Sequence, residues 1–428
     1  MRPAATPVRI PEGKPMKIVV MGQGYVGLPL AMAAVEAGHD VIGLELDEQR
    51  CSQLRSGTSY IEDVPDKALQ TALKTGRYRP TGDEERLAGF DVAVIAVPTP
   101  LKERLPDLTA VRLAAEMLAR YVHRGCTVIL ESTTHPGTTR QIVLPLLEVR
   151  SRLRAGVGFH LGFSPERIDP GNEEWTFANT PKIVSGLTEE CRERVREFYA
   201  GITQNVVPAD SLEEAELAKV FENTFRHVNI ALVNEFSRVA HTLGVDVWRT
   251  LDLAGSKPFG FTKFTPGPGV GGHCLPVDPV FLSHHVRTKY GEPFRLVELA
   301  QDINEAQPSY VVARLQNALN IRHGKALKDS RVLALGLAYK PGVADSRQSP
   351  AVEVVTELKQ KGAQVDTMDP HATGTVRGPL APLPYQTYDA VVLLTAHQEF
   401  DLAQIAAEAP YVLDTRGVMP DAPHIERL

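Results

Sequence analysis

The sequence predicts an α/β fold with two Rossmann-like, doubly wound domains joined by a long central helix and a small helical middle domain. Three observations predict it. A strand, a turn, a helix and a second strand follow one another near the N-terminus and again after residue 330. A helical pattern of unusual length covers residues 212–243 between these two blocks. The chain has 428 residues, which is too many for one domain of ~100 to 200 residues.

The first block has the order of a βαβ unit. Residues 16–21 form an apolar strand, residues 22–27 a turn of the pattern Gly-x-Gly-x-x-Gly, residues 28–37 a helix, and residues 40–45 a second strand ending in Glu45. Strand, glycine turn, helix and acidic residue in this order are typical of a dinucleotide-binding unit. The alternative is a structural βαβ turn that binds no ligand.

The glycine turn and the acidic residue predict NAD as the cofactor. Gly22 makes the tight turn, Gly24 leaves room for a pyrophosphate, and Gly27 lets helix and strand pack closely. Glu45 would accept hydrogen bonds from the adenosine ribose and repel the 2′-phosphate of NADP. The cofactor contacts expected in this block are Gly22, Gly24, Tyr25, Val26, Gly27, Glu45 and Arg50. For Arg50 a purely structural role is an open alternative.

Two further strands, at residues 91–97 and 127–131, each end in a polar turn. Ligands of open α/β sheets lie beyond the carboxyl ends of the strands. We therefore expect Pro98, Thr99 and Thr133 in these turns to line the cofactor cleft.

Residues in two neighbouring segments could have either a structural role or a role in the site. For Thr138 and Thr139 we favour helix capping over contact with the cofactor. The strand at residues 159–163 runs into a constrained turn that carries Glu166 and Arg167. These two residues are candidates for the site, and the alternative is a surface ion pair.

The long helix at residues 212–243 carries Lys219, Asn223 and Arg226 at helical spacing, and thus near one face. A helix of this length could bridge two domains. Its amphipathic length also gives weak support for a homodimer, or a higher homo-oligomer, built on it.

A loop rich in glycine and proline, at residues 266–279, presents Cys274 and, about one helical turn later, Asp278. Glycine permits backbone angles closed to other residues and a close approach of ligands, and proline restricts the ends of the loop. Cysteine is commonly buried as a small hydrophobe, but the neighbours of Cys274 are glycine and proline. We therefore predict that Cys274 is a nucleophile beside a substrate.

The second α/β block carries basic residues in place of the glycine pattern. Its strands and helix are expected at residues 332–336, 351–361, 364–368, 390–394 and 411–414. Lys340 and Arg347 lie in the turn before the helix, where the N-terminus of a helix attracts an anion. A second nucleotide-type ligand would suit this turn.

Charge and composition exclude several partners. The 46 Lys and Arg and the 52 Asp and Glu give a net charge of -6 and are interspersed, so neither nucleic acid nor an anionic membrane is expected as partner. No segment approaches the roughly 20 apolar residues of a membrane span, and residues 1–15 have no apolar signal region. We expect a cytoplasmic protein.

The cysteines and histidines predict neither a disulfide framework nor a metal site. Cys51, Cys126, Cys191 and Cys274 are widely scattered, as expected for reduced thiols. The side chains of the adjacent histidines His284 and His285 are expected to point in different directions, and no carboxylate is spaced to complete a metal site with them, so no metal is expected.

A hydride acceptor beside a nucleophilic cysteine suggests oxidation through a thioester. From about Lys17 to about Arg416 the sequence resembles the UDP-glucose/GDP-mannose dehydrogenase family. The resemblance rests on six ordered motifs: the glycine turn at Gly22, the turns at residues 98–100 and 132–133, residues 164–167, residues 219–226, residues 272–274 and residues 340–350.

The resemblance implies a four-electron oxidation of a sugar C6 alcohol to a carboxylate with two NAD. Cys274 would form a thiohemiacetal and then a thioester, which water would cleave. His273 and Val277 resemble the branch acting on UDP-N-acetylhexosamines, so UDP-GlcNAc or UDP-ManNAc is the expected substrate. The implied domains are an extension at 1–15, an NAD-binding domain at 16–208, a central helical and dimerisation domain with the cysteine loop at 209–322, and a UDP-sugar-binding domain at 323–428.

The resemblance also implies roles for individual residues. Lys219 and Asn223 would donate to the oxyanion, and Asp278 would order a water or take up protons. Glu166 would position the hydrolytic water, and Thr133 would hold it. Residues implied in substrate binding are Glu166, Arg167, Lys219, Asn223, Arg226, Phe264, Gly269, Gly271, Tyr339 and Lys340. Arg347 would bind a phosphate, expected to be the cofactor's. Some members carry a second glutamate where this chain has Pro170, which puts that cofactor contact in doubt.

Three alternatives remain open at this point. The substrate could be UDP-glucose or GDP-mannose. A two-electron hydroxyacid dehydrogenase shares the first domain, the long helix and its Lys-x-x-x-Asn spacing, but needs neither Cys274 nor the second nucleotide domain. A binding protein without catalysis would lack the cysteine, lysine or aspartate of the site, and all three are present.

Overall fold

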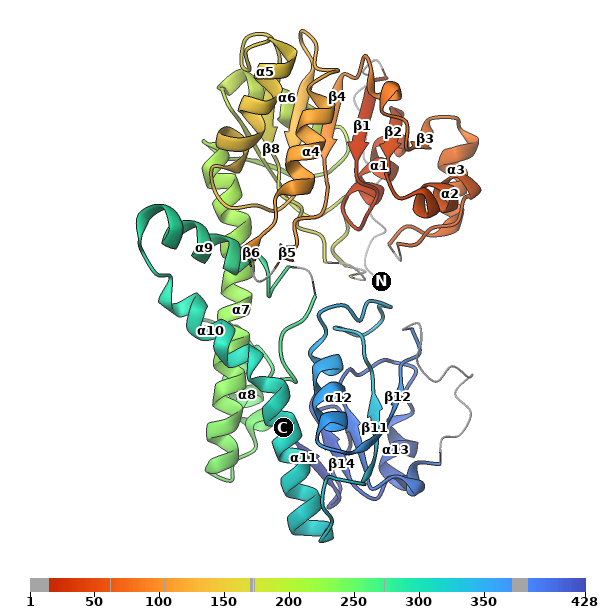
Figure 1. Ribbon diagram of the computed structural model, residues 1–428, viewed down its shortest axis with the longest axis vertical. Helices are drawn as coiled ribbons and strands as arrows, with labels where there is room; N and C mark the ends of the chain where they lie inside the picture. The colour runs from red at the N-terminus through yellow and green to blue at the C-terminus, as the bar shows by residue number, and fades with distance from the viewer. Residues whose placement is uncertain are drawn as a thin grey trace. The chain divides into compact units, whose positions relative to one another are not determined.

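The computed structural model describes residues 15–61, 63–102, 105–169, 172, 174–272, 274–371 and 384–428. The chain divides into two compact units, Met1–Glu222 and Asn223–Leu428. The boundary between the units falls within helix α7, Leu212–Thr242 (Figure 1). The four domain limits expected from the sequence remain predictions.

The first unit is built on an eight-stranded sheet with the strand order β10-β9-β8-β7-β4-β1-β2-β3. Neighbouring strands run parallel, except that β9 is antiparallel to β8. The strands are β1 Lys17–Met21, β2 Asp40–Leu44, β3 Tyr78–Thr81, β4 Val92–Ile95, β7 Thr127–Leu130, β8 His160–Phe163, β9 Lys182–Gly186 and β10 Val206–Pro208. A separate antiparallel hairpin pairs β5, Leu101–Lys102, with β6, Leu105–Pro106.

Helices cover both faces of this sheet. They are α1 Gly27–Glu36, α2 Glu48–Ser56, α3 Asp66–Lys74, α4 Thr109–Leu118, α5 Leu144–Ser151 and α6 Glu189–Ala200, with the short helical turns η1 Glu84–Leu87 and η2 Thr139–Val143. In β1, Val19 belongs to the apolar cluster under α4 and α5, whereas Ile18 and Val20 belong to the cluster under α1, α3 and α6. Both faces of the strand are buried, which explains why it reads as an unbroken apolar run.

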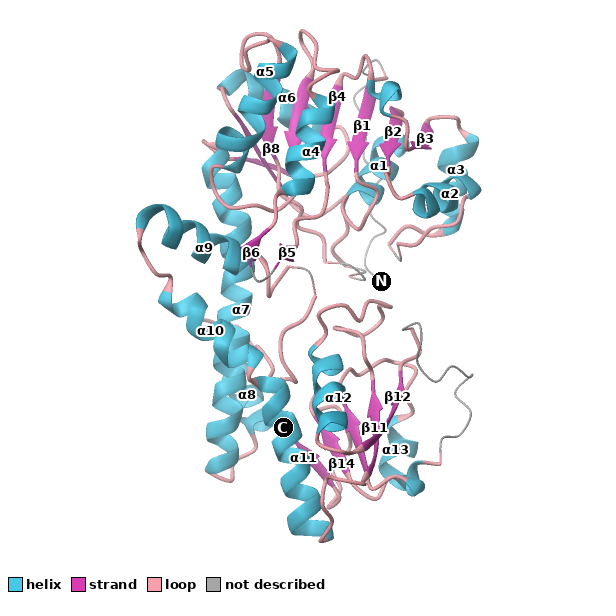
Figure 2. Cartoon of the chain, viewed as in Figure 1, coloured by secondary structure: helices cyan, strands magenta, loops and turns pink. Residues whose placement is uncertain are grey.

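The second unit contains a five-stranded parallel sheet with the order β12-β11-β13-β14-β15. Figure 2 labels β11, β12 and β14 of this sheet. Its strands are β11 Arg331–Leu335, β12 Gln364–Met368, β13 Ala390–Leu393, β14 Val412–Asp414 and β15 Ile425–Arg427. Its helices are α8 Val247–Gly255, α9 Asp278–Tyr290, α10 Arg295–Glu305, α11 Gln307–His323, α12 Pro350–Gln360 and α13 Leu402–Glu408, with the short turn η3 Tyr385–Thr387.

The strands of this sheet also bury both faces. Val332 and Ala334 of β11 pack with α11 and α12, and Leu333 and Leu335 pack on the opposite face with α13. A mainly parallel sheet and a fully parallel sheet, each with helices on both faces, confirm the expected fold class.

The expected strands and helices of both α/β blocks are confirmed, with ends that differ by one or two residues. The long helix expected at residues 212–243 is α7. Among the helices that the structure describes, none combines the length and the apolar character needed to cross a bilayer.

Candidate active site

The glycine turn after β1 has the geometry that a dinucleotide needs. Gly22 has a φ of +90°, and a Cβ at this position would lie 2.5 Å from the Ala96 carbonyl oxygen. A Cβ at Gly27 would overlap the carbonyl oxygen of Gly22, so α1 approaches the turn too closely for any side chain. By contrast, apart from Gly24 and its two chain neighbours, no heavy atom of the residues that the structure describes lies within 4 Å of the place where a Cβ at Gly24 would stand. The space above Gly24 is therefore open, as the binding of a pyrophosphate requires.

Glu45 stands beside this turn at the end of β2. Its Oε2 accepts a hydrogen bond from the Gln23 amide at 3.3 Å, and its Oε1 accepts one from the Asp47 amide at 3.0 Å. The carboxylate is half-buried, so lone pairs remain available on an oriented anion. These residues fit NAD: an acceptor for the ribose diol stands next to an open, glycine-lined space.

Arg50 is exposed, and its guanidinium lies 5.4 Å from the centre of the Tyr60 ring. The Tyr60 hydroxyl donates to the Gln23 carbonyl oxygen at 2.7 Å. Arg50 therefore stays near the glycine turn through Tyr60. Tyr25 and Val26, within the turn, are half-buried.

The neighbouring strands end in register at the same edge of the sheet. Met21 pairs with Ile95, Ile95 with Leu130, and Leu130 with Phe163. The turns that follow these strands carry Gly22, Pro98, Thr99, Thr133 and Glu166. The structure thus brings these predicted residues to one edge.

Two of these turns are joined directly. The Ser132 hydroxyl donates to the Val97 carbonyl oxygen at 2.7 Å. Thr133 is half-buried beside it, and on the other turn Pro98 is exposed and Thr99 half-buried.

A buried carboxylate on α7 holds the end of the turn after β7. Glu216 is fully buried and accepts hydrogen bonds from the Gly137 amide at 2.5 Å, the Thr139 amide at 2.8 Å and the Thr139 hydroxyl at 2.6 Å. The Thr138 hydroxyl donates to the His135 carbonyl oxygen at 2.7 Å. The capping interpretation of Thr138 and Thr139 is therefore wrong, since neither side chain caps the helical turn that follows.

Burial raises the pKa of Glu216 to about 7, against the opposing effect of these hydrogen bonds. The buried Lys219 follows one helical turn later on α7. Glu216 was not predicted from the sequence, where it reads as one of several acidic residues at the start of a helix.

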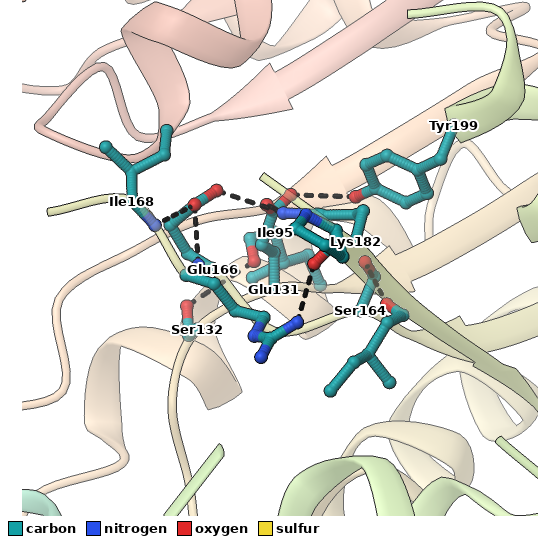
Figure 3. A network of polar contacts seen from close by, with 11 residues as sticks. Ile95, Glu131, Ser132, Ser164, Glu166, Ile168, Lys182 and Tyr199 are labelled. Atoms are coloured by element: carbon teal, nitrogen blue, oxygen red, sulfur yellow. Dashed lines mark hydrogen bonds and ion pairs between the residues drawn. The ribbon is translucent and has the colours of Figure 1, made fainter. Parts of the chain in front are cut away.

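Glu166 lies in a buried polar network (Figure 3). It is 8% exposed, and its Oε1 accepts hydrogen bonds from the Arg167 amide and the Ile168 amide, both at 2.6 Å. Its Oε2 accepts from the Lys182 ammonium at 2.9 Å. The same ammonium binds Glu131, whose Oε2 accepts from the Tyr199 hydroxyl at 2.8 Å.

The contacts of Glu166 and Arg167 decide between a place in the site and a surface ion pair. The side chain of Arg167 binds the Glu222 carboxylate at 2.7 Å and donates to the Pro181 carbonyl oxygen at 2.7 Å. A surface ion pair between Glu166 and Arg167 is therefore wrong. Arg167 instead joins its turn to α7.

The pKa values of the two carboxyl groups in the network shift in opposite directions. Burial raises the pKa of Glu131 to about 7, although Lys182 opposes the shift. Burial also acts to raise the pKa of Glu166, but Lys182 and the hydrogen bonds prevail and lower it. Glu166 is thus held as an anion. Neither Glu131 nor Lys182 was predicted; the available signal was a charged residue at the end or start of an otherwise apolar strand.

In the second unit, the chain around Cys274 leads directly into α9. The Cys274 carbonyl oxygen accepts hydrogen bonds from the Val277 amide at 3.1 Å and the Asp278 amide at 2.8 Å. Asp278 is 3% exposed, and its Oδ2 accepts from the Asn223 side-chain amide at 2.5 Å. The structure thus brings together Asn223 and Asp278, two residues that lie 55 positions apart.

The four cysteines all lie in described residues, and none forms a disulfide. Cys51, Cys126 and Cys191 are buried, whereas Cys274 is exposed. Exposure is the property that a nucleophile needs and a packing cysteine lacks. His273 lies outside the described residues, as does Pro170.

Two buried asparagines support the start of the cysteine loop. The Gly267 amide donates to Asn234 Oδ1 at 3.0 Å, and Asn234 Nδ2 donates to Asn304 Oδ1 at 3.0 Å. Asn304 in turn donates to the His227 carbonyl oxygen at 3.2 Å. The loop is therefore bound to α7 and α10 through side chains that sequence reasoning missed.

The glycines of the loop are required by its contact with Tyr339. A Cβ at Gly271 would lie 2.8 Å from the Gln348 carbonyl oxygen and 2.9 Å from the Tyr339 Cβ. Gly272 has a φ of +88°, and a Cβ there would lie 3.0 Å from the Tyr339 ring. A Cβ at Gly269 would lie 2.9 Å from Pro350. The cysteine loop and the turn after β11 thus pack against each other.

That turn lies at the carboxyl edge of the second sheet, where β11 has β12 on one side and β13 on the other. Asp369 Oδ2 accepts from the Leu337 amide at 2.6 Å and the Ala338 amide at 2.9 Å. The Thr395 hydroxyl donates to the Ala338 carbonyl oxygen at 2.6 Å. The carboxyl edge is the expected ligand position of a doubly wound sheet, and half-buried Lys340 lies in the turn that follows β11 at this edge.

Not every predicted binding residue joins such a cluster. Arg347 is exposed and forms two hydrogen bonds of 2.9 Å with Asp345 in its own turn. Arg226 is exposed on α7. Phe264 is half-buried, with its ring centre 5.7 Å from that of Phe225.

Within the described residues, one group could offer ligands to a metal ion. His371, His397 and Glu399 place ligand atoms within 4.8 Å of one another. Both ring nitrogens of His397 have partners, however: Asp369 Oδ2 at 3.1 Å and the Gly342 amide at 3.3 Å. The arrangement fits a hydrogen-bonded structural group better than a metal site.

The first unit has the geometry of a dinucleotide-dependent oxidoreductase, and the second adds an exposed thiol and another nucleotide-type sheet. Residues 16–203 match the NAD binding domain of the UDP-glucose/GDP-mannose dehydrogenase family, residues 213–306 its central domain, and residues 333–421 its UDP binding domain. The class is therefore that of the NAD-dependent nucleotide-sugar dehydrogenases. The chain belongs to the UDP-glucose/GDP-mannose dehydrogenase family, as its sequence motifs implied.

Several relatives match over nearly the whole chain. A UDP-N-acetyl-D-mannosamine dehydrogenase of Pyrococcus horikoshii is 37% identical over 389 residues, which are 90% of each chain. A UDP-N-acetyl-D-glucosamine 6-dehydrogenase of Pseudomonas aeruginosa is 36% identical over 90% of this chain and 92% of its own. The solved structure of the UDP-D-ManNAc dehydrogenase from Pyrococcus horikoshii has a TM-score of 0.89 at 34% identity and covers 96% of this chain and 99% of its own.

Proposed function

We propose that this protein oxidises the C6 alcohol of a UDP-N-acetylhexosamine to the carboxylate, with two NAD, through a thioester on Cys274. The single observation that carries this proposal is the exposed Cys274, which ends a glycine loop and leads into α9. A two-electron oxidation of an alcohol needs no nucleophile. The similarity to two N-acetylhexosamine dehydrogenases supports the choice of substrate.

Cys274 would attack the aldehyde that the first oxidation produces, and the thiohemiacetal would keep that aldehyde on the protein. Bound NAD supplies the hydride acceptor for both oxidation steps. Asn223 and Lys219, one turn apart on α7, would donate to the oxyanion. Preorganised donors in such a site are worth about 3 kcal/mol each.

The contact between Asn223 and Asp278 supports these roles. A carboxylate that accepts from the Asn223 amide fixes how that amide points, so the donor is oriented before substrate binds. Asp278, a buried carboxylate four residues after Cys274 in the sequence, would order a water or take up protons.

Hydrolysis of the thioester needs an ordered water. Glu166 is held as an anion by two backbone amides and an ammonium, and we assign it the positioning of that water together with Thr133. Because its pKa is lowered, Glu166 would act by accepting a hydrogen bond.

Lys340 and Tyr339 would bind the UDP moiety, with the peptide groups of Gly269 and Gly271 completing the pocket. Arg347, Arg226, Arg167 and Phe264 stay assigned to phosphate and substrate binding. For the cofactor, the space over Gly24 and the Glu45 carboxylate remain the principal contacts. The scattered thiols and the charge pattern support a cytoplasmic location.

We also propose a homodimer that buries one face of α7. Phe221 and Leu232 are 62% and 60% exposed on this helix. Large apolar side chains at such exposure are typical of an interface between chains. Light scattering coupled to size exclusion tests the dimer: the mass of a single chain would contradict it.

The reaction is tested by stoichiometry. With UDP-GlcNAc, UDP-ManNAc, UDP-glucose, the UDP-galacto sugars and GDP-mannose as a panel, an N-acetylhexosamine should give the highest kcat/KM and two NADH per molecule of acid. One NADH per product would support the two-electron alternative. A preference for UDP-glucose or GDP-mannose would contradict the proposed substrate but not the proposed four-electron oxidation.

A further inference from the structure

Lys182 occupies an unusual position beneath the strand ends of the first sheet. Its side chain is 5% exposed, and its ammonium binds Glu131 and Glu166, with side chains 0% and 10% exposed. The ammonium also lies 5.1 Å from the centre of the Tyr199 ring and 5.5 Å from that of Phe177. Two carboxylates and two aromatic rings therefore surround one cation away from water.

Such a network is costly unless every member is satisfied, because two anions and one cation leave water on folding. Here Glu131 binds Lys182 and Tyr199, and Glu166 binds Lys182 and two backbone amides. A purely structural need at this place would be met by apolar side chains of similar volume. The charges therefore call for a role that apolar residues cannot perform.

The members of the network come from neighbouring elements around the predicted site. Glu131 follows β7 and immediately precedes Ser132 and Thr133, Glu166 follows β8, and Lys182 begins β9. By binding both Glu131 and Glu166, Lys182 thus connects the turn that carries Thr133 with the turn that carries Glu166 (Figure 3).

We propose that Lys182 is a positioning residue for the deacylation step: with Glu131 behind it, it holds the Glu166 carboxylate in one orientation toward the hydrolytic water. The proposal rests on the function given above, in which Glu166 positions that water. Lys182 itself does not touch the reacting atoms in this scheme.

In deacylation, the oxygen of water bonds to the thioester carbon and the carbon–sulfur bond breaks. The electron pair of that bond leaves with the sulfur of Cys274. One proton of the water passes to the sulfur, and the other is released as the acid ionises. No oxidant takes part, so loss of Lys182 should spare both NADH-forming steps.

Rapid mixing of enzyme, NAD and sugar nucleotide separates the steps. In Lys182→Met we expect two NADH per Cys274 to form at nearly the wild-type rate, followed by deacylation about 100-fold slower, the effect of misplacing a reacting group by about 1 Å. Intact mass spectrometry should then show the acyl group on Cys274 in the variant, whereas wild type should show little.

Lys182→Met leaves two carboxylates buried around one site and could fail to fold. The double variant Glu131→Gln/Lys182→Met buries one negative charge fewer, and its deacylation rate is the second measurement of the effect of losing Lys182. Lys182→Arg keeps the cation and should recover most of the deacylation rate. Lys325→Met is the matched control, since Lys325 forms an ion pair with Asp389 at 2.6 Å in the second unit.

A purely structural role for Lys182 predicts equal losses in acylation and deacylation, together with a lower thermal midpoint, and this result would overturn the proposal. Wild-type deacylation in both the single and the double variant would overturn it as well. If wild type yields one NADH per product and neither wild type nor Lys182→Met carries an acyl group on Cys274, the proposed function fails and the role of Lys182 fails with it.

Discussion

The substitution Asn234→Ala tests whether the buried asparagine pair holds the cysteine loop in its working position. Asn234 is fully buried, accepts from the Gly267 amide and donates to Asn304. Removing its side chain leaves one buried N–H and one buried carbonyl oxygen without partners. Each such group costs about 1 to 3 kcal/mol, so the loop conformation should lose at least about 2 kcal/mol in total.

This magnitude sets two measurable changes. A loss of about 2 kcal/mol corresponds to a factor of about 30, since 1.4 kcal/mol is tenfold. We expect kcat/KM to fall by about that factor, and hydrogen exchange of the Gly267 amide, followed by mass spectrometry, to accelerate by at least as much. Exchange is read on the free protein, so it reports the loop independently of catalysis.

Asn229→Ala is the matched control. Asn229 lies on the same helix and donates to the Phe225 carbonyl oxygen at 2.7 Å, within α7 itself. Asn234→Asp adds a graded test, because the aspartate still accepts from the Gly267 amide. Unchanged exchange at Gly267 in Asn234→Ala, equal to that of Asn229→Ala, would refute the reasoning.

Three other substitutions give separate expectations. Gly24→Ala should fold with wild-type stability, because the added methyl enters open space, but its affinity for NAD should fall about tenfold, the equivalent of 1.4 kcal/mol. A melting curve checks the stability and calorimetric titration checks the affinity. Unchanged NAD affinity would contradict the placement of the pyrophosphate. Cys274→Ala should bind NAD but form no detectable uronic acid by mass spectrometry, and wild-type turnover would exclude the nucleophile. Both ring nitrogens of His227 are buried and have no hydrogen-bond partner in the part of the chain that the structure describes, and burial lowers the pKa of His227 to about 4. The unfolded chain therefore takes up a proton as pH falls below about 6.5 while the folded protein does not, a loss of about 2 kcal/mol at pH 5. His227→Leu should remove that part of the acid sensitivity, and equal melting shifts between pH 8 and pH 5 in both proteins would show the assignment to be wrong.

Local sequence signals were enough to predict the fold and those residues whose environment is formed by their neighbours in the sequence. The glycine turn at Gly22, the apolar strands and the long helix are periodic or compositional patterns, and neighbouring residues suffice to read them. Cys274 was proposed as a nucleophile for the same reason, because glycine and proline around a cysteine are visible without a structure, and that role stays a prediction. Thr139 shows the limit: its capping role was inferred from local preference, but its hydroxyl binds Glu216, 77 residues away.

The residues that escaped prediction act through partners far along the chain. Lys182 meets Glu131 across 51 positions, and Asn304 meets Asn234 across 70. No spacing rule connects such pairs, since their proximity depends on which strands pair and which helices pack. A lysine at the start of a strand reads as a surface residue until the sheet order buries it.

The sequence alone therefore determined the class of fold, the cofactor and the family, and it singled out Cys274 as the candidate nucleophile, because each depends on a short run of residues with its own geometry. Tertiary structure alone decided that Glu166 is a buried anion, that Arg167 binds α7, and that Asn223 and Asp278 are in contact. These are consequences of burial and of opposing charges brought together by folding. The free energy of such a group is set by the neighbours that surround it in space, and these neighbours come from distant parts of the chain.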